Sequence, residues 1–218
     1  TETAMIPGIS GAGADPADLC AVRSTDLGLL ARGHTVSVAA VPTTAGGTGT
    51  PAMFAHAMTD LHDLDVLCVD AGIGLPTRAP VVPVGSGPGG DIRAETALPN
   101  AGALHERAKA LGAGLPDEHI LVGETIPGGT TTAYGVLSAL GEPTGVSSSL
   151  AENPVELKRT VVEEGLATSG LQAGEASGEP IRALEAMGDP VLATIAGLVE
   201  GALGAGITVE LGGGTQLG

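Results

Sequence analysis

Residues 123–133 read G-E-T-I-P-G-G-T-T-T-A, and this stretch decides the fold that we predict. The apolar run before it, 119–122, indicates a buried strand, and residues 132–141 after it indicate a helix that ends at a glycine. Gly128 and Gly129 allow positive φ angles and a close approach of the backbone to a ligand. Unpaired amides and the helix dipole at such a helix start favour an anion. The stretch therefore predicts a phosphate-binding site.

The threonines of this stretch, and the motifs that it lacks, narrow the choice of ligand. Thr130, Thr131 and Thr132 carry hydroxyls that can cap the helix or bind phosphate oxygens. The stretch has no Gly-Lys-Ser/Thr and is not G-x-G-x-x-G, so it is neither a Walker A loop nor a dinucleotide fingerprint. We therefore expect a monophosphate ligand. The alternative is a glycine turn that serves only tight packing of a strand against a helix.

A second glycine loop and a lysine are candidate partners of this site. The loop G-G-G-T-Q at 212–216 follows a predicted strand at 207–211. Loops at the carboxyl ends of strands in one parallel sheet face one crevice, so we expect Gly212 and Gly213 near the same phosphate. Lys158 is one of only two lysines and can supply a point charge. The alternative for Lys158 is a solvated helix residue.

Alternating strands and helices predict an α/β fold with a three-layer, mainly parallel Rossmann-like sheet flanked by helices. We expect strands at 34–41, 65–70, 119–122 and 207–211, with an edge strand or extended segment at 79–84. We expect further helices at 51–63, 99–111 (ending at Gly112), 154–166 (with Asn153 as N-cap), 180–187 and 190–203. Of two other glycine-rich segments, 85–93 is a third loop, and 8–15 is interpreted as a flexible loop rather than a binding loop.

The apolar side chains have one unusual feature. The chain is 43% apolar but contains one Phe, one Tyr and no Trp, so its core must consist of Val, Leu, Ile and Ala. Within the helix at 51–63, an apolar stripe has helical spacing, and we expect it to pack: Met53, Phe54, Ala57, Met58 and Leu61.

The charge balance excludes some partners. With 25 acidic and 9 basic residues the net charge is −16, which argues against binding to a nucleic-acid backbone. A solvated acidic surface explains the charge, and we favour adaptation to a salt-rich cytoplasm, where salt screens the repulsion. Cys20 and Cys68 form no C-x-x-C, and His56 and His62 lack metal spacing, so we expect no metal and no cofactor. We see no membrane span or leader and expect a cytoplasmic protein.

The quoted stretch, extended to residue 141, resembles the motif of nicotinate-nucleotide–dimethylbenzimidazole phosphoribosyltransferases and their archaeal relatives. Residues 152–166, E-N-P-V-E-L-K-R-T-V-V-E-E-G-L, resemble the family segment whose lysine meets the phosphate. Residues 212–216 resemble its third glycine loop, while V-D-A-G-I-G-L-P (69–76) and G-S-G-P-G-G-D-I-R (85–93) are similar to the archaeal branch.

This resemblance implies transfer of the 5-phosphoribosyl group of nicotinate mononucleotide to a benzimidazole-type base, with release of nicotinate, for the lower ligand of a cobamide. It implies the following phosphate ligands: Gly128, Gly129, Thr130, Thr131, Lys158, Gly212 and Gly213. The family's general base is a glutamate in a C-terminal segment that has no counterpart here. By chemistry Asp70, Asp91, Glu124 and Glu175 are candidates, and Glu124 and Asp70 rank first because they follow predicted strands.

We expect one domain over residues 1–218, incomplete at its C-terminus and with internal gaps, that acts on small molecules as a homodimer. Two alternatives to the enzyme stay open at this point. The first is a non-catalytic protein that binds a nucleotide monophosphate with the same fold. The second is a structural subunit of an oligomer.

Overall fold

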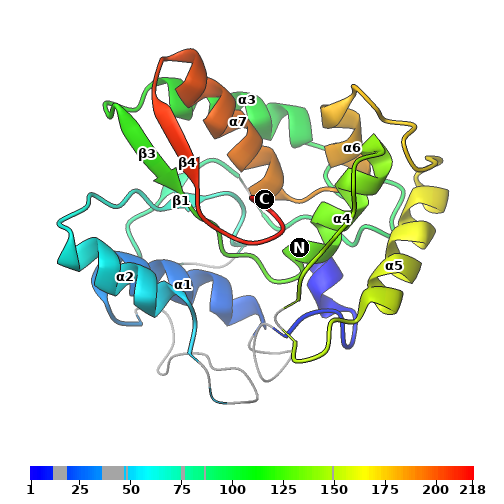
Figure 1. Cartoon of the computed structure of the whole chain (residues 1–218), viewed down its shortest axis with the longest axis horizontal. Helices are drawn as coiled ribbons and strands as arrows, with labels where there is room; N and C mark the ends of the chain where they lie inside the picture. The colour runs from blue at the N-terminus through cyan, green and yellow to red at the C-terminus, as the bar shows by residue number, and fades with distance from the viewer. Residues whose placement is uncertain (12–18, 36–46, 48, 75–76, 86, 149) are drawn as a thin grey trace. The chain divides into compact units, whose positions relative to one another are not determined.

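The computed structural model describes residues 1–11, 19–35, 47, 49–74, 77–85, 87–148 and 150–218. Its elements fall into a larger unit, Thr1–Ser10 with Pro88–Gly218, and a smaller unit, Gly11–Gly87 (Figure 1). We describe each unit by itself, and the single domain over residues 1–218 stays a prediction. Most of the predicted strand at 34–41 and half of the loop at 8–15 lie outside the described residues.

The core of the larger unit lies between three helices, α4 (Gly129–Leu140), α5 (Val155–Thr168) and α6 (Pro180–Met187). As composition predicted, the buried core residues are almost all aliphatic: Ile6, Ile9, Ile92, Ala139, Val161, Val162, Leu166, Leu171, Ala183 and Met187. Glycines let these helices approach one another. A Cβ atom on Gly135 would lie 3.0 Å from the Cβ of Met187, and one on Gly165 would lie 2.4 Å from the carbonyl oxygen of Ile92, so a side chain at either position would force its neighbour to move.

Two further helices of the larger unit, α3 (Ala101–Ala113) and α7 (Pro190–Gly204), pack along each other (Figure 1). The prediction that α3 ends at Gly112 is wrong. Gly112 lies inside the helix, where a Cβ atom would be 2.1 Å from the carbonyl oxygen of Leu198 in α7. This glycine is used for close helix packing and does not end the helix.

The larger unit contains one parallel strand pair, β3 (His119–Val122) with β4 (Thr208–Leu211). The location of the strand at 119–122 is confirmed, but its predicted burial is wrong, because Leu121 is 67% exposed. Among the described residues β3 pairs only with β4. The strands described form two sheets of two strands each, so the fold is mixed α/β with parallel pairing.

The smaller unit contains α1 (Leu19–Arg32), α2 (Ala52–Leu61) and the parallel strands β1 (Val69–Asp70) and β2 (Val82–Pro83). Helix α1 was not predicted. The predicted edge strand is confirmed in part by β2, where the amide of Val82 donates to the carbonyl of Cys68 at 2.9 Å. Pro83, which has no amide hydrogen, pairs opposite Asp70.

The apolar stripe of α2 does not pack as expected. No residue of this helix is buried, and Phe54, the only phenylalanine of the chain, is 73% exposed. Helical spacing predicted which residues share a face, but it does not determine what covers that face.

Two predicted helix starts need correction. Helix α4 begins at Gly129, three residues earlier than predicted, so the three threonines lie in its first turn. Helix α5 begins at Val155 with Pro154 as its N-cap. Asn153 is not the cap, because its side-chain amide donates to the carbonyl of Val146 at 2.7 Å.

Candidate phosphate-binding site

The start of α4 presents free backbone donors. Gly128, the N-cap, has φ +79°, a left-handed conformation that favours glycine. Its carbonyl accepts from the amides of Thr131 and Thr132 at 3.0 Å and 3.4 Å. Within the described part of the chain, the amides of Gly129 and Thr130 have no acceptor. These two donors, with the positive end of the helix dipole, favour an anion at this position.

Lys158 of α5 extends to this helix start. Its side chain is fully buried, and its Nζ donates to Thr130 Oγ1 at 3.0 Å and to the carbonyl of Ser147 at 2.6 Å. No carboxylate of the described residues lies within ion-pair distance of this ammonium. Burial lowers the pKa of Lys158 below its ordinary value. A buried cation without a carboxylate partner is unusual, because such charges are normally paired.

The loop after β4 meets the same helix start. The amide of Gly212 donates to the carbonyl of Val122 at 2.9 Å, which continues the β3–β4 pairing into the loop. The carboxamide of Gln216 lies directly over Gly129, where a Cβ atom would be 2.3 Å from its nitrogen. Thr215 Oγ1 accepts from the amide of Ser147 at 2.9 Å. Ser147 therefore joins this loop to Lys158.

The structure thus brings together most of the residues that the sequence singled out for phosphate. Gly128, Gly129 and Thr130 share the start of α4, Lys158 contacts Thr130, and the loop that begins with Gly212 and Gly213 reaches Gly129 through Gln216. Thr131 differs from its neighbour. It is fully buried, and among the described residues its hydroxyl has no hydrogen-bond partner.

The two preferred catalytic carboxylates lie in different units. Glu124 is half-buried, is separated from the end of β3 by one residue and belongs to the phosphate-binding stretch itself. Asp70 belongs to the smaller unit, where its Oδ1 accepts from the amides of Gly72 and Ile73 at 2.8 Å and 2.7 Å. Asp70 therefore has a local structural role, because these bonds stabilise the turn that follows β1.

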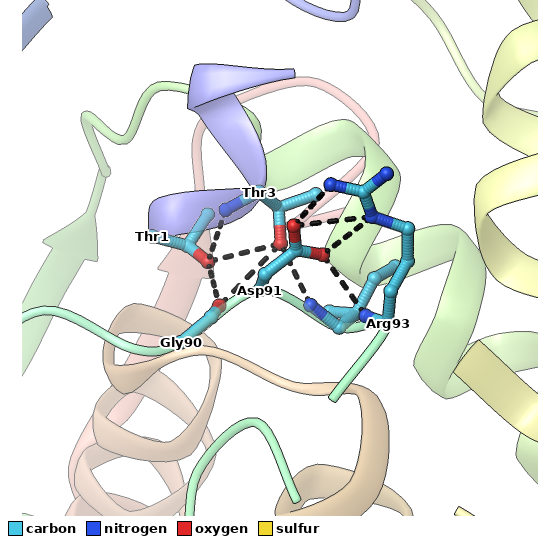
Figure 2. A network of polar contacts seen from close by, with 6 residues as sticks. Thr1, Thr3, Gly90, Asp91 and Arg93 are labelled. Carbon is cyan, nitrogen blue, oxygen red and sulfur yellow. Dashed lines mark hydrogen bonds and ion pairs between the residues drawn. The ribbon is translucent and has the colours of Figure 1, made fainter. Parts of the chain in front are cut away.

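The two lower-ranked carboxylates have partners of their own. Asp91 forms an ion pair with Arg93 at 2.6 Å (Figure 2). Burial raises the pKa of Asp91, but the hydrogen bonds and the charge of Arg93 outweigh this effect and hold the pKa below its ordinary value. Glu175 accepts from the amide of Gln172 at 2.9 Å. A carboxylate with a lowered pKa, such as Asp91, is a weak proton acceptor.

The third glycine loop supports the site indirectly. The 3-10 helix η1 (Glu2–Met5) is fastened to it, because Thr1 Oγ1 donates to the carbonyl of Gly90 at 2.7 Å and Thr3 Oγ1 accepts from the amide of Ile92 at 3.1 Å (Figure 2). Helix η1 in turn packs on the N-cap of α4. A Cβ atom on Gly128 would lie 3.0 Å from the Cβ of Ala4.

Sequence reasoning missed Ser147, Gln216 and Ala4 as parts of this site. Gln216 lies in a loop that the sequence did single out, so its position beside the glycines was a usable signal. Ser147 contributes its backbone carbonyl, and Ala4 contributes its size. Neither a backbone carbonyl nor a small side chain can be recognised as part of a site from a single sequence.

Two kinds of feature are absent from the described residues. No group of three or more His, Cys, Asp or Glu side chains is placed to hold a metal ion there. Within the same residues, no helix is both long enough and apolar enough to cross a membrane.

No family profile matches the chain, but individual proteins do. A UPF0284 protein of Halobacterium salinarum is 54% identical over 217 residues, which are 100% of this chain and 65% of that protein. A UPF0284 protein of Methanosarcina acetivorans is 40% identical over 220 residues, 100% of this chain and 63% of that protein. The chain thus spans slightly less than two thirds of the length of these relatives.

Solved structures share the fold. The crystal structure of CobT from Thermus thermophilus has a TM-score of 0.60 at 23% identity, over 94% of this chain and 58% of that one. A nicotinate-nucleotide-dimethylbenzimidazole phosphoribosyltransferase from the same organism has a TM-score of 0.55 at 23% identity, over 74% of this chain and 50% of that one. At 23% identity these structures show a shared fold, which agrees with the resemblance that the motifs indicated.

Proposed function

We propose that the chain is a phosphoribosyltransferase. It is a homologue of the UPF0284 proteins, and it has the fold of nicotinate-nucleotide-dimethylbenzimidazole phosphoribosyltransferases. It transfers the 5-phosphoribosyl group of nicotinate mononucleotide to a benzimidazole-type base and releases nicotinate. The product is the α-riboside phosphate of the nucleotide loop in cobamide biosynthesis. The observation that carries the proposal is Lys158, a buried ammonium that forms no ion pair with a carboxylate of the described residues and contacts a helix start with free amides.

Binding comes first in the proposed mechanism. The 5-phosphate accepts from the amides of Gly129 and Thr130 and from the third proton of the Lys158 ammonium, whose other two are used by Thr130 and Ser147. The loop that begins at Gly212 closes over the phosphate. A fixed phosphate holds the ribose at a defined distance from the end of β3, where Glu124 stands.

Glycosyl transfer then follows at the ribose. The bond between the anomeric carbon and the pyridinium nitrogen breaks, and its electron pair goes to nicotinate, leaving an oxocarbenium-like centre. The unprotonated ring nitrogen of the incoming base forms the new bond with its lone pair, and the base loses the proton carried by its other ring nitrogen. We assign this proton to Glu124, with Asp70 as the second candidate, because a carboxylate is a suitable acceptor at neutral pH.

Two measurements test the proposed function. Titration calorimetry with nicotinate mononucleotide should show binding, and chromatography should show nicotinate release when dimethylbenzimidazole is added. Glu124→Gln should keep the affinity within about threefold and lower turnover by about 10²–10⁴-fold, the usual contribution of a general base. Full turnover in this variant would remove Glu124 from the role. Binding without release by the wild-type protein would favour a non-catalytic nucleotide-binding protein.

We also propose that the whole protein builds a three-layer, mainly parallel Rossmann-like sheet. The parallel pairing of β3 with β4 supports this arrangement, and the exposure of Leu121 and Leu211 is what uncovered parallel strands would show. We further propose a cytoplasmic homodimer that acts on small molecules. The exposed apolar face of α2, which includes Phe54, supports an intermolecular contact.

Salt dependence tests the proposed adaptation to a salt-rich cytoplasm. With a net charge of −16, the folded chain repels itself, and its 54% identical relative comes from Halobacterium salinarum. We expect the melting temperature to rise as KCl increases to roughly 1 M, where the screening length falls to about 3 Å. An uncharged osmolyte at equal osmolality is the control, and it should raise the melting temperature less than KCl does. Maximal stability at low KCl would contradict this prediction.

A further inference from the structure

The three consecutive threonines at the start of α4 have different partners, although the sequence treats them alike. Thr130 Oγ1 accepts from Lys158, and Thr131 Oγ1 is buried without a partner among the described residues. Thr132 Oγ1 has two acceptors, the carbonyl of Gly129 at 2.9 Å and the carboxylate of Asp189, which share its single proton. Thr132 is fully buried, so its hydroxyl serves protein groups.

Asp189 is a fully buried carboxylate that joins two helix starts. It is the N-cap of α7, where its Oδ1 accepts from the amides of Val191 and Leu192 at 2.8 Å and 3.0 Å. Its Oδ2 accepts from Thr132 in α4. No lysine, arginine or histidine of the described residues forms an ion pair with it, so hydrogen-bond donors and the dipole of α7 stabilise the charge.

The bond from Thr132 to Gly129 has a geometric consequence for phosphate binding. The carbonyl of Gly129 and the amide of Thr130 belong to one peptide group, which is planar. Fixing the direction of that carbonyl therefore fixes the direction of the Thr130 N–H. This N–H is one of the two free donors at the start of α4.

We infer that Thr132 and Asp189 are positioning residues of the phosphate-binding site: Asp189 orients the Thr132 hydroxyl, which holds the Gly129–Thr130 peptide group with its amide toward the ligand. The inference rests on the proposed function for the identity of the ligand. Neither residue needs to touch the phosphate. Their effect is preorganisation, since a donor held in place costs less ordering entropy on binding.

The packing behind the helix start makes this arrangement rigid. A Cβ atom on Gly89 would lie 2.9 Å from Pro190, the residue after Asp189. The carbonyl of Gly89 accepts from the amide of Glu2 at 2.8 Å, and η1 packs on Gly128 through Ala4. The N-termini of α4 and α7 are thus supported by the same glycine loop, part of which Figure 2 shows.

Valine substitution separates positioning from general stability. Thr132→Val keeps the shape and removes the hydroxyl, whereas Thr132→Ser keeps the hydroxyl. Thr194→Val is the matched control, because Thr194 is a buried threonine of α7 whose hydroxyl has no partner among the described residues. We expect Thr132→Val to weaken binding of inorganic phosphate, measured by calorimetry, by roughly tenfold. Thr132→Ser and Thr194→Val should bind within about twofold of the wild type.

Amide hydrogen exchange gives a readout that does not depend on a ligand. In Thr132→Val, the amides of residues 131–133 should lose roughly tenfold more protection than amides in the middle of α4. Equal losses throughout the helix, or wild-type phosphate affinity in Thr132→Val, would overturn the inference. If the wild type binds neither phosphate nor nicotinate mononucleotide, the proposed function is wrong. The exchange pattern alone then tests whether Thr132 holds the start of α4 in place.

A second variant covers the case in which Thr132→Val does not fold. Serine at position 189 still caps α7 through its hydroxyl, but it has no second oxygen to accept the Thr132 proton. Asp189→Ser should therefore show the same selective loss of protection at residues 131–133. Wild-type protection at these amides in Asp189→Ser would overturn the inference.

Discussion

Replacing Lys158 with methionine is expected to weaken binding of nicotinate mononucleotide by about 10- to 150-fold, which corresponds to the roughly 1.5–3 kcal/mol of a hydrogen bond to a charged group. The ammonium is fully buried and contacts Thr130 and Ser147, but no carboxylate of the described residues competes for it. Its charge is therefore available to a phosphate. Methionine has a similar length and no charge, so we expect the variant to fold and to melt no lower than the wild type.

The other lysine of the chain provides the control. Lys109 is partly exposed and pairs with Glu200 at 2.5 Å on the surface of α3 and α7. Lys109→Met changes the net charge by the same amount and should leave the affinity for nicotinate mononucleotide within about twofold, because exposed ion pairs contribute little. Equal losses in both variants would mean that net charge, and not the position of Lys158, governs binding.

The pH dependence of binding provides a second measurement on Lys158. Because burial lowers its pKa below the ordinary value of 10.5, the folded protein loses this proton at a lower pH than the unfolded chain. Affinity for phosphate should fall as the pH rises toward 10.5, while phosphate itself stays dianionic. The free energy of unfolding should rise over the same pH range, since the unfolded chain binds more protons there than the folded chain does. Lys158→Met should show neither change.

A methyl group at Gly201 is expected to lower the free energy of unfolding by about 3 kcal/mol. In α7 a Cβ atom at this position would lie 2.0 Å from the carbonyl oxygen of Lys109 in α3. Backbone cannot move aside as a flexible side chain can, so α3 and α7 would have to separate. Thermal unfolding of Gly201→Ala should show a melting temperature lower by roughly 6–12 °C.

Gly204 is the matched control for this prediction, because it is the last residue of the same helix and a Cβ atom there meets nothing within 4 Å. Gly204→Ala should be neutral or stabilise the protein by up to about 1 kcal/mol, as alanine favours helix. If Gly201→Ala melts like Gly204→Ala, the two helices do not pack as closely as the structure shows.

The site was predictable wherever its chemistry is local in sequence. A strand, two glycines and a helix start follow one another along the chain, so the anion-binding character of Gly128 and Gly129 could be predicted from propensity alone. The contact of Lys158 with Thr130 joins residues 28 positions apart. Only the rarity of lysine suggested it, because side-chain contacts between helices depend on how the helices pack.

The positions of most strands and helices could be predicted from the sequence, but their burial was harder to predict. Strands at 119–122 and 207–211 and helices at 180–187 and 190–203 match β3, β4, α6 and α7 to within a residue. The prediction failed for Gly112, which was taken as a helix end and proved to be a packing position. A glycine has the same local preferences in both roles, and only the neighbouring helix distinguishes them.

By itself, the sequence determined the order of strand, glycine turn and helix, the acidic charge and the aliphatic core, because these follow from local backbone preferences and composition. The tertiary structure alone decided that Lys158 meets Thr130, that Gln216 covers Gly129 and that Asp189 holds Thr132. These contacts join residues that are far apart along the chain. Their distances are fixed by the packing of α4 against α5 and of the loops at the ends of β3 and β4, and local sequence does not encode that packing.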